Sequence, residues 1–305
     1  MRRTIFISGT NSGIGKAIVE FFASKGWNVA ATVRNVDEYP NLFASFPNVR
    51  LYSLEMTDYQ QIENIVKQVI SDFKRVDVVV NNAAYCLIGP LETTSMEQLK
   101  NQYETNVFGV YATIKAFLPH LRENSKGTII NIASSSAQFN FPFISGYGST
   151  KWAIRGITES LGIELAPFNI QVKAIYPGTH ATGIFTKLDH GTNALNDAYR
   201  AYKPSYRNFI SAQKIYPKAT APESAAKEIW RAVAMGTKGK LHFVTGGDAK
   251  FQALMKKILP QRSFQKMQIG LIDKPTKESS RGFIKWLFGK NVQEVKTDIP
   301  QSLLS

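Results

Sequence analysis

The chain has 305 residues, a formal net charge of +14 and a single cysteine. Its length allows one large α/β domain with a substantial core, or two small domains. The single cysteine, Cys86, excludes an internal disulfide framework and leads us to expect a cytoplasmic protein. With only four scattered histidines we expect no metal site. No apolar run approaches the ~20 residues that a membrane-spanning helix requires.

Strand and helix patterns alternate from residue 4 to residue 245. The expected strands are Thr4–Ser8, Asn28–Val33, Val49–Leu54, Val76–Asn81, Gly127–Ala133, Ile170–Tyr176 and Leu241–Val244. Helical patterns lie between them, for example at Ile14–Lys25, Tyr59–Phe73, Ala153–Phe168 and Glu223–Ala234. Near-continuous apolar strands indicate burial on both faces. We therefore expect right-handed β-α-β units in one α/β domain, a Rossmann-like, doubly wound parallel sheet of about seven strands.

A glycine-rich turn follows the first expected strand, with glycines at Gly9, Gly13 and Gly15. Glycines at this point permit a tight turn and close approach of the backbone to a phosphate, which the next helix faces with its N-terminus. The rival interpretation is a nucleotide-binding loop of the Walker A type. That motif requires Gly where the chain has Thr10, and Ser or Thr where it has Ala17. The turn therefore favours a dinucleotide.

The end of the second expected strand indicates which dinucleotide. Dinucleotide folds place an acid near this point for a ribose 2′-hydroxyl, or an Arg for a 2′-phosphate. The chain has Arg34 followed by Asn35 and no acid at the strand end. Position and charge favour NADP(H), although Arg34 could also be a solvated loop cation.

A Tyr-x-x-x-Lys pair carries the expected chemistry. The chain contains three such pairs, Tyr111/Lys115, Tyr147/Lys151 and Tyr199/Lys203. In a helix the two side chains share a face, so the ammonium would favour the phenolate and lower the pKa of the phenol. A phenol tuned in this way can exchange a proton with an alcohol or a carbonyl. Only the pair Tyr147/Lys151 follows a buried strand that ends in serines, with Ser134 thirteen residues before the tyrosine. If that strand extends through the serines, alternation would point Ser135 away from the site.

These ordered motifs resemble the short-chain dehydrogenase/reductase family over residues 4–245. The resemblance rests on the glycine turn, Asn81–Ala84, Asn106, the group Ser134, Tyr147 and Lys151, and Pro177-Gly178 with Thr182. It implies that Tyr147 is the general acid in carbonyl reduction and the general base in alcohol oxidation. Lys151 would lower the pKa of Tyr147 and bind the nicotinamide ribose. Ser134 would orient the substrate oxygen, and Asn106 would hold a water that connects Lys151 to solvent.

The resemblance also implies a set of cofactor contacts. NADP(H) would lie against Gly9, Asn11, Ser12, Gly13, Ile14, Gly15, Arg34, Asn35, Glu55, Met56, Asn82, Ala83, Ala84, Tyr147, Lys151, Pro177, Gly178 and Thr182. Departures from the family pattern are few: Ser8 stands for Thr, Ala84 for Gly, and Glu55-Met56 for Asp-Val. Ser12 replaces the basic residue of some NADP-using members, so binding of the 2′-phosphate would depend on Arg34.

Two regions interrupt the alternation of strands and helices. Residues 182–220 show no strand pattern, and we expect a substrate lid there. Its aromatic residues, Phe185, Tyr199, Tyr202, Tyr206 and Phe209, suit an apolar substrate but could equally pack the lid onto the domain. The catalytic domain would cover residues 1–247, and a basic, amphipathic extension would cover residues 248–305.

The expected activity is hydride transfer between NADP(H) and an apolar carbonyl or secondary alcohol, such as a steroid, a retinoid or another ketone or aldehyde. A ketoacyl-type reductase and a catalytically silent NADP(H)-binding sensor are the alternatives. Between Lys250 and Lys290 the chain has ten basic and two acidic residues. With no nucleic-acid motif we expect no nucleic acid partner, and weak membrane contact through Gly282–Phe288 is a minor possibility. A homodimer or homotetramer is compatible with the resemblance.

Overall fold

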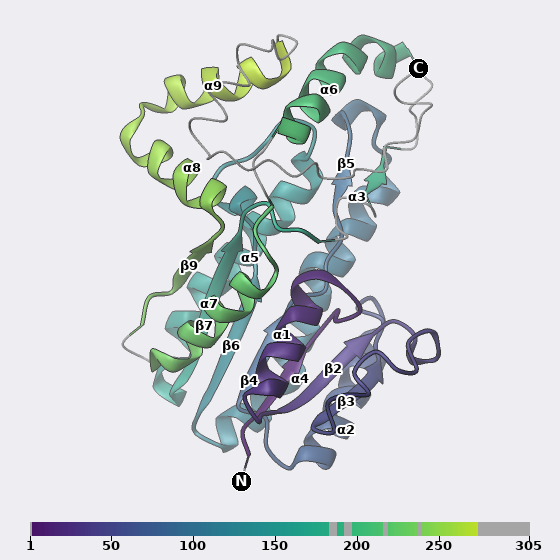
Figure 1. Cartoon of the computed structure of the whole chain (residues 1–305), viewed down its shortest axis with the longest axis vertical. Helices are drawn as coiled ribbons and strands as arrows, with labels where there is room; N and C mark the ends of the chain where they lie inside the picture. The colour runs from purple at the N-terminus through teal and green to yellow at the C-terminus, as the bar shows by residue number, and fades with distance from the viewer. Residues whose placement is uncertain (1, 183–187, 192–196, 216–218, 237–238, 274–305) are drawn as a thin grey trace.

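The computed structural model describes residues 2–182, 188–191, 197–215, 219–236 and 239–273. Its centre is a seven-stranded, all-parallel sheet with the strand order β3-β2-β1-β4-β6-β7-β9 (Figure 1). The strands are β1 (Thr4–Ile7), β2 (Asn28–Val33), β3 (Val49–Ser53), β4 (Val78–Asn81), β6 (Gly127–Ile132), β7 (Ile170–Pro177) and β9 (His242–Thr245). The doubly wound α/β fold expected from the sequence is confirmed.

Helices cover both faces of the sheet. They are α1 (Gly13–Ser24), α2 (Tyr59–Phe73), α3 (Met96–Tyr103), α4 (Gly109–Glu123), α5 (Ser145–Glu164), α6 (Asp197–Ile215), α7 (Glu223–Ala234), α8 (Gly247–Ile258) and α9 (Gln261–Asp273). Helices α1 and α7 pack on one face, and α2, α4 and α5 on the other. The sheet therefore separates two hydrophobic cores.

The first three residues of strand β4 are all valines. Val79 packs into the core beneath α2, α4 and α5, whereas Val78 and Val80 pack into the core beneath α1 and α7. All three side chains are fully buried. Alternate residues of a strand point to opposite faces, so a strand covered on both faces favours apolar residues at successive positions.

Local signals define several helix starts. Asp58 accepts a hydrogen bond from the backbone N–H of Gln61 at the start of α2. Ser95 and Gln98 form a reciprocal capping box at the start of α3. Such caps satisfy N–H groups that lack an intrahelical acceptor, which is why the helices begin where they do.

Two expectations about element boundaries were wrong. Helix α5 begins at Ser145, eight residues before the expected start at Ala153, so that it includes both Tyr147 and Lys151. The region 182–220 contains a short strand, β8 (Asp189–His190), which pairs in parallel with β5 (Leu87–Ile88). A two-residue strand carries too few alternating residues for a sequence pattern to indicate it.

The C-terminal part of the described chain packs beside α6. Helix α9 lies next to α6, and the side chain of Asn208 donates to the backbone carbonyl of Ile272 at 3.0 Å. The spacing of Phe251, Leu254, Met255 and Ile258 suggests an apolar face of α8. Phe251 and Met255 are half-buried, whereas Leu254 and Ile258 are exposed. The segment Gly282–Phe288, expected to contact membranes, lies outside the described residues.

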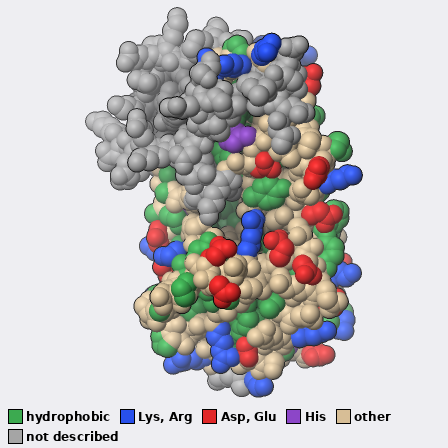
Figure 2. Space-filling view, turned by 90° about the vertical axis from the view of Figure 1, so that its right-hand side faces the viewer, with side chains coloured by type: hydrophobic (Ala, Val, Ile, Leu, Met, Phe, Trp, Pro, Cys, Tyr) green, Lys and Arg blue, Asp and Glu red, His purple; other side chains and the backbone are tan. Residues whose placement is uncertain are grey.

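Charges of both signs are mixed on the surface. Figure 2 shows Lys and Arg side chains interspersed with Asp and Glu over the described part of one face, with hydrophobic side chains between them. That face therefore carries no large field of a single sign. Within the described ranges, no helix is both long and apolar enough to cross a membrane.

Candidate active site

A cavity of about 680 Å³ opens at the carboxyl ends of the strands. Parallel strands that alternate with helices place such crevices at this edge of the sheet. The residues expected at the site that line the cavity are Gly9, Asn11, Ser12, Gly13, Ile14, Gly15, Arg34, Glu55, Met56, Asn82, Ala83, Ala84, Ser134, Tyr147, Lys151, Pro177, Gly178 and Thr182. Asn35 and Asn106, which were also expected there, are not among the lining residues.

The glycine turn is shaped for close contact with a ligand. Gly9 and Gly13 have φ angles of +71° and +59°, a region that favours glycine. A Cβ atom on Gly15 would lie 2.1 Å from the backbone oxygen of Gly9. The side chain of Asn82 donates to the same oxygen at 2.7 Å. The turn and the segment after β4 therefore form one rigid unit, and each of the three positions requires glycine.

Ser8 holds the two segments of this unit together. Its hydroxyl accepts hydrogen bonds from the backbone N–H groups of Asn82 and Ala83, at 3.0 Å and 3.1 Å. At the start of α1, the N-cap residue Ser12 makes no side-chain capping bond. Its side chain and the first turn of the helix line the cavity, which is the arrangement of an anion site at a helix N-terminus.

An arginine and an acid lie at the end of the cavity that is farthest from Tyr147 in the order of the strands. The side chain of Arg34 is 77% exposed, and its Nε atom lies 3.8 Å from a carboxylate oxygen of Glu55. Glu38 and Tyr39 also line the cavity. Asn35 instead accepts from the N–H of Asp37 and caps a short 3₁₀ helix. The residues present suit a ribose phosphate at Arg34. Glu38 is an acid near the end of the second strand that the sequence at the strand end alone did not indicate.

Ser134, Tyr147 and Lys151 meet at the centre of the cavity. Tyr147 is 9% exposed and Lys151 is 3% exposed. The Nζ atom of Lys151 lies 5.7 Å from the centre of the Tyr147 ring and donates to the backbone oxygen of Ile132 at 2.9 Å. Strand β6 ends at Ile132, before the serines, so alternation along the strand does not separate them. Ser135 and Ser136 line the cavity beside Ser134.

The net pKa of Tyr147 is raised in this structure, not lowered as the neighbouring Lys151 led us to expect. Burial raises the pKa of Tyr147, the nearby Cys86 thiol adds to the rise, and a hydrogen bond with Ser134 opposes it. Burial also lowers the pKa of Lys151 to about 8. Removal from water disfavours every charged form, so both side chains move toward neutrality. The phenol is therefore protonated at neutral pH and can act as an acid.

Asn106 lies in a π-helical turn, Glu104–Phe108, between α3 and α4. Its side chain accepts from the N–H of Tyr85 at 3.1 Å and donates to the oxygen of Tyr85 at 3.0 Å and to Thr150 at 3.2 Å. π-Helical turns are frequent at functional sites. In the described structure Asn106 ties the segment after β4 to α5, one residue before Lys151.

Three residues that sequence reasoning missed lie at the cavity, and two of them, Asp248 and His180, contact the loop after β7. Asp248 accepts from the N–H of Thr179 at 2.7 Å, and a Cβ on Gly178 would lie 2.2 Å from its other oxygen. His180 is buried and contacts the Gly178 oxygen and the Ser224 hydroxyl, each at 3.0 Å. Gln252 lines the cavity one helical turn beyond Asp248. The four-residue spacing of Asp248 and Gln252 on an otherwise apolar and basic helix is the signal that could have revealed them.

Comparison with known proteins identifies the family of the chain. The family model described as short chain dehydrogenase matches residues 3–193. The chain belongs to the short-chain dehydrogenase family. It is 31% identical over 272 residues to an uncharacterized oxidoreductase, YusZ, of Bacillus subtilis, covering 87% of this chain and 96% of the relative. It is 30% identical to an NADPH-dependent 3-dehydrocapnine reductase of Ornithobacterium rhinotracheale, covering 91% of this chain and all of the relative.

Solved structures share the fold as well. A short-chain dehydrogenase from Streptomyces avermitilis superposes with a TM-score of 0.73 at 29% identity, covering 88% of this chain and 99% of that chain. The structure of ElxO with NADP bound superposes with a TM-score of 0.68 at 28% identity, covering 82% of this chain and all of that chain. The fold and the oxidoreductase family thus have independent support.

Proposed function

We propose that this chain is an NADP(H)-dependent oxidoreductase that reduces the carbonyl group of an apolar substrate. The observation that carries the proposal is that Ser134 and the buried side chains of Tyr147 and Lys151 line the cavity that also contains the glycine turn and Arg34. A nicotinamide cofactor would supply the hydride, which leaves positioning and proton transfer to the protein. Two relatives support the direction, since they are named as reductases of 3-dehydrocapnine and 3-ketodihydrosphingosine.

Each side chain of the central group has a distinct role. Tyr147 donates its proton to the substrate oxygen, and its raised pKa keeps the phenol protonated at neutral pH before the transfer. Ser134 hydrogen-bonds the same oxygen and holds it at the phenol. The Lys151 ammonium lies beside the Tyr147 ring and stabilises the phenolate that remains after proton transfer. Asn106 acts through the backbone, as a positioning residue that holds α5 against the segment after β4.

The walls of the cavity beyond this group are apolar. The apolar side chains that line it are Phe141, Ile144, Leu188, Phe209 and Ile88. Phe143 packs edge-on against Tyr206 and at a steep angle against Phe209, with ring centres 5.3 Å and 5.7 Å apart. Tyr206 and Phe209 therefore pack onto the domain, Phe209 also lines the cavity, and an apolar ketone suits this surface.

A matched pair of variants tests the activity. Tyr147→Phe removes the proton donor, and Tyr111→Phe removes the hydroxyl of an exposed tyrosine that also precedes a lysine by four residues. We expect Tyr147→Phe to lose at least about a hundredfold in NADPH-dependent reduction of a ketone panel, since general acids contribute about 10²–10⁴-fold. Tyr111→Phe should keep wild-type turnover. Wild-type turnover by Tyr147→Phe would contradict the assignment.

A second pair tests the cofactor preference. Arg34→Ala removes the cation that would bind a 2′-phosphate, and Glu38→Gln removes the neighbouring negative charge. Hydrogen bonds to charged groups contribute about 1.5–3 kcal/mol, so Arg34→Ala should lower kcat/KM for NADPH by roughly 10–100-fold and leave NADH nearly unchanged. Glu38→Gln should improve NADPH use slightly. If wild type prefers NADH and Glu38→Gln removes that preference, Glu38 binds the ribose and the cofactor is NAD(H).

A further inference from the structure

Helix α8 presents a line of polar side chains to the catalytic domain. Asp248, Gln252 and Lys256 are spaced four residues apart and therefore share one face of the helix. The first of them fixes the N-terminal end, because Asp248 accepts from the N–H of Thr179 at 2.7 Å and touches the Gly178 backbone. One end of the helix is thus attached to the loop after β7, which lines the cavity.

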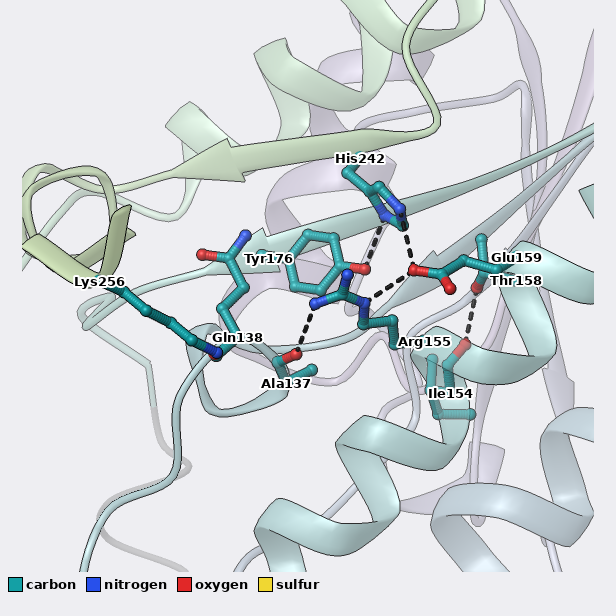
Figure 3. Close-up of polar contacts among 9 residues, drawn as sticks. All are labelled: Ala137, Gln138, Ile154, Arg155, Thr158, Glu159, Tyr176, His242 and Lys256. Atoms are coloured by element: carbon teal, nitrogen blue, oxygen red, sulfur yellow. Dashed lines mark hydrogen bonds and ion pairs between the residues drawn. The ribbon is translucent and has the colours of Figure 1, made fainter. Parts of the chain in front are cut away.

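The other end is attached to the segment that follows Ser134. Lys256 donates to the backbone oxygen of Gln138, and its Nζ atom lies 5.2 Å from the centre of the Trp152 ring. From α5, Arg155 donates to the neighbouring oxygen of Ala137 at 3.4 Å. Figure 3 shows both cations directed at this segment, from opposite sides. Helix α8 therefore spans from the loop after β7 to the serine segment.

Arg155 itself is held by a polar network behind the site. It donates to Glu159 at 2.8 Å, and His242 contacts the same carboxylate at 3.2 Å. The other ring nitrogen of His242 lies 2.7 Å from the Tyr176 hydroxyl (Figure 3). These contacts join α5, β7 and β9, so the frame on which α8 rests is fixed by several hydrogen bonds.

Gln252 lies midway between the two attachments. Its side chain is 7% exposed and lines the cavity. Unlike Asp248 and Lys256, its carboxamide makes no hydrogen bond with any residue in the described ranges. The carboxamide of Gln252 is not among the fully buried polar atoms that lack a partner, so it is open to the cavity that it lines. A ligand in the cavity can therefore supply its hydrogen-bond partner.

We propose that Gln252 hydrogen-bonds a neutral polar group, such as a hydroxyl, that lies beside the carbonyl of an otherwise apolar substrate. The carboxamide both donates and accepts, which suits a hydroxyl, and it carries no charge to match an ionic group. The apolar walls at Phe141, Ile144 and Phe209 would hold the hydrocarbon part. The substrate class is then a hydroxyketone with an apolar chain, and this inference rests on the proposed reductase function.

The test compares two ketones that differ by one hydroxyl, 2-decanone and 1-hydroxy-2-decanone, with NADPH. A site built to hydrogen-bond a hydroxyl discriminates strongly against the analogue that lacks it. We expect wild type to prefer the hydroxyketone at least about tenfold in kcat/KM. Gln252→Leu should remove that preference by losing activity on the hydroxyketone alone. The control Leu254→Ala, on the exposed side of the same helix, should keep it.

Other outcomes decide against the inference. A wild-type enzyme that reduces both ketones equally well overturns it while leaving the reductase function intact. Equal losses on both ketones in Gln252→Leu assign the residue a packing role. Weaker NADPH binding by Gln252→Leu in a fluorescence titration assigns the carboxamide to the cofactor. Failure of wild type to reduce any ketone with NADPH removes the proposed function itself. If Gln252→Leu does not fold, two other measurements decide. They are the preference of wild type between the two ketones and the same preference in Gln252→Glu, which keeps the acceptor.

Discussion

The buried carboxamide of Asn106 gives the structure a test that depends on hydrogen bonding rather than on turnover. In Asn106→Ala the N–H of Tyr85 loses its acceptor, and such an orphaned group costs about 1–3 kcal/mol. The oxygen of Tyr85 keeps a second donor, Gln102 at 2.8 Å, so its loss is smaller. With the bond to Thr150 also lost, we expect the free energy of unfolding to fall by about 2–4 kcal/mol.

Urea denaturation followed by circular dichroism measures this change. Asn106→Asp keeps an acceptor for the Tyr85 N–H and should lie between wild type and Asn106→Ala. The control is Asn101→Ala, at an exposed position of α3, which should change the free energy of unfolding by no more than about 0.5 kcal/mol. A loss below about 1 kcal/mol in Asn106→Ala would refute the reasoning, because it would mean that water replaces the carboxamide at no cost.

Two further outcomes follow from the geometry of the cavity. Gly15→Ala should abolish NADPH binding in a fluorescence titration, since its Cβ would lie 2.1 Å from the Gly9 oxygen, whereas Gly156→Ala, with no atom within 4 Å, should bind normally. The pKa of Lys151 is lowered to about 8, so its ammonium is present below that pH and is lost as the pH rises through it. The single-turnover rate of reduction should therefore fall above pH 8, and a rate that stays constant to pH 10 would exclude a role for the charged form.

The fold could be predicted because its determinants are local and repeated. Strand β4 needs apolar residues on both faces, and the chain supplies Val78, Val79 and Val80 in succession. The glycine turn could be located for a similar reason, since only glycine fits where Gly15 meets the Gly9 oxygen. By contrast, the pairing of β5 with β8 joins two short segments far apart in the chain, and a two-residue strand leaves no periodicity to detect.

The electrostatics of the site could not be predicted from spacing. The four-residue separation of Tyr147 and Lys151 correctly indicates that an ammonium lies near a phenol. It contains no information on burial, and burial is the largest influence on the pKa of both groups. A lysine lowers the pKa of a phenol only if the lysine is protonated and close. Desolvation acts on each group regardless of its partner. Depth below the surface is a property of the assembled fold, so the sign of the shift emerged only with the structure.

The orientation of helix α8 could not be predicted from its sequence either. Full burial of an aliphatic side chain contributes about 1.5–3 kcal/mol, so the spacing of Leu254 and Ile258 favours packing that face inward. The helix instead leaves both exposed and turns Asp248 and Gln252 toward the cavity. An orientation that forgoes apolar burial requires a compensating set of contacts, and Asp248 supplies one at the Thr179 N–H. Local rules fail most often at functional sites, and Gln252 lies on the face of α8 that is turned toward the cavity.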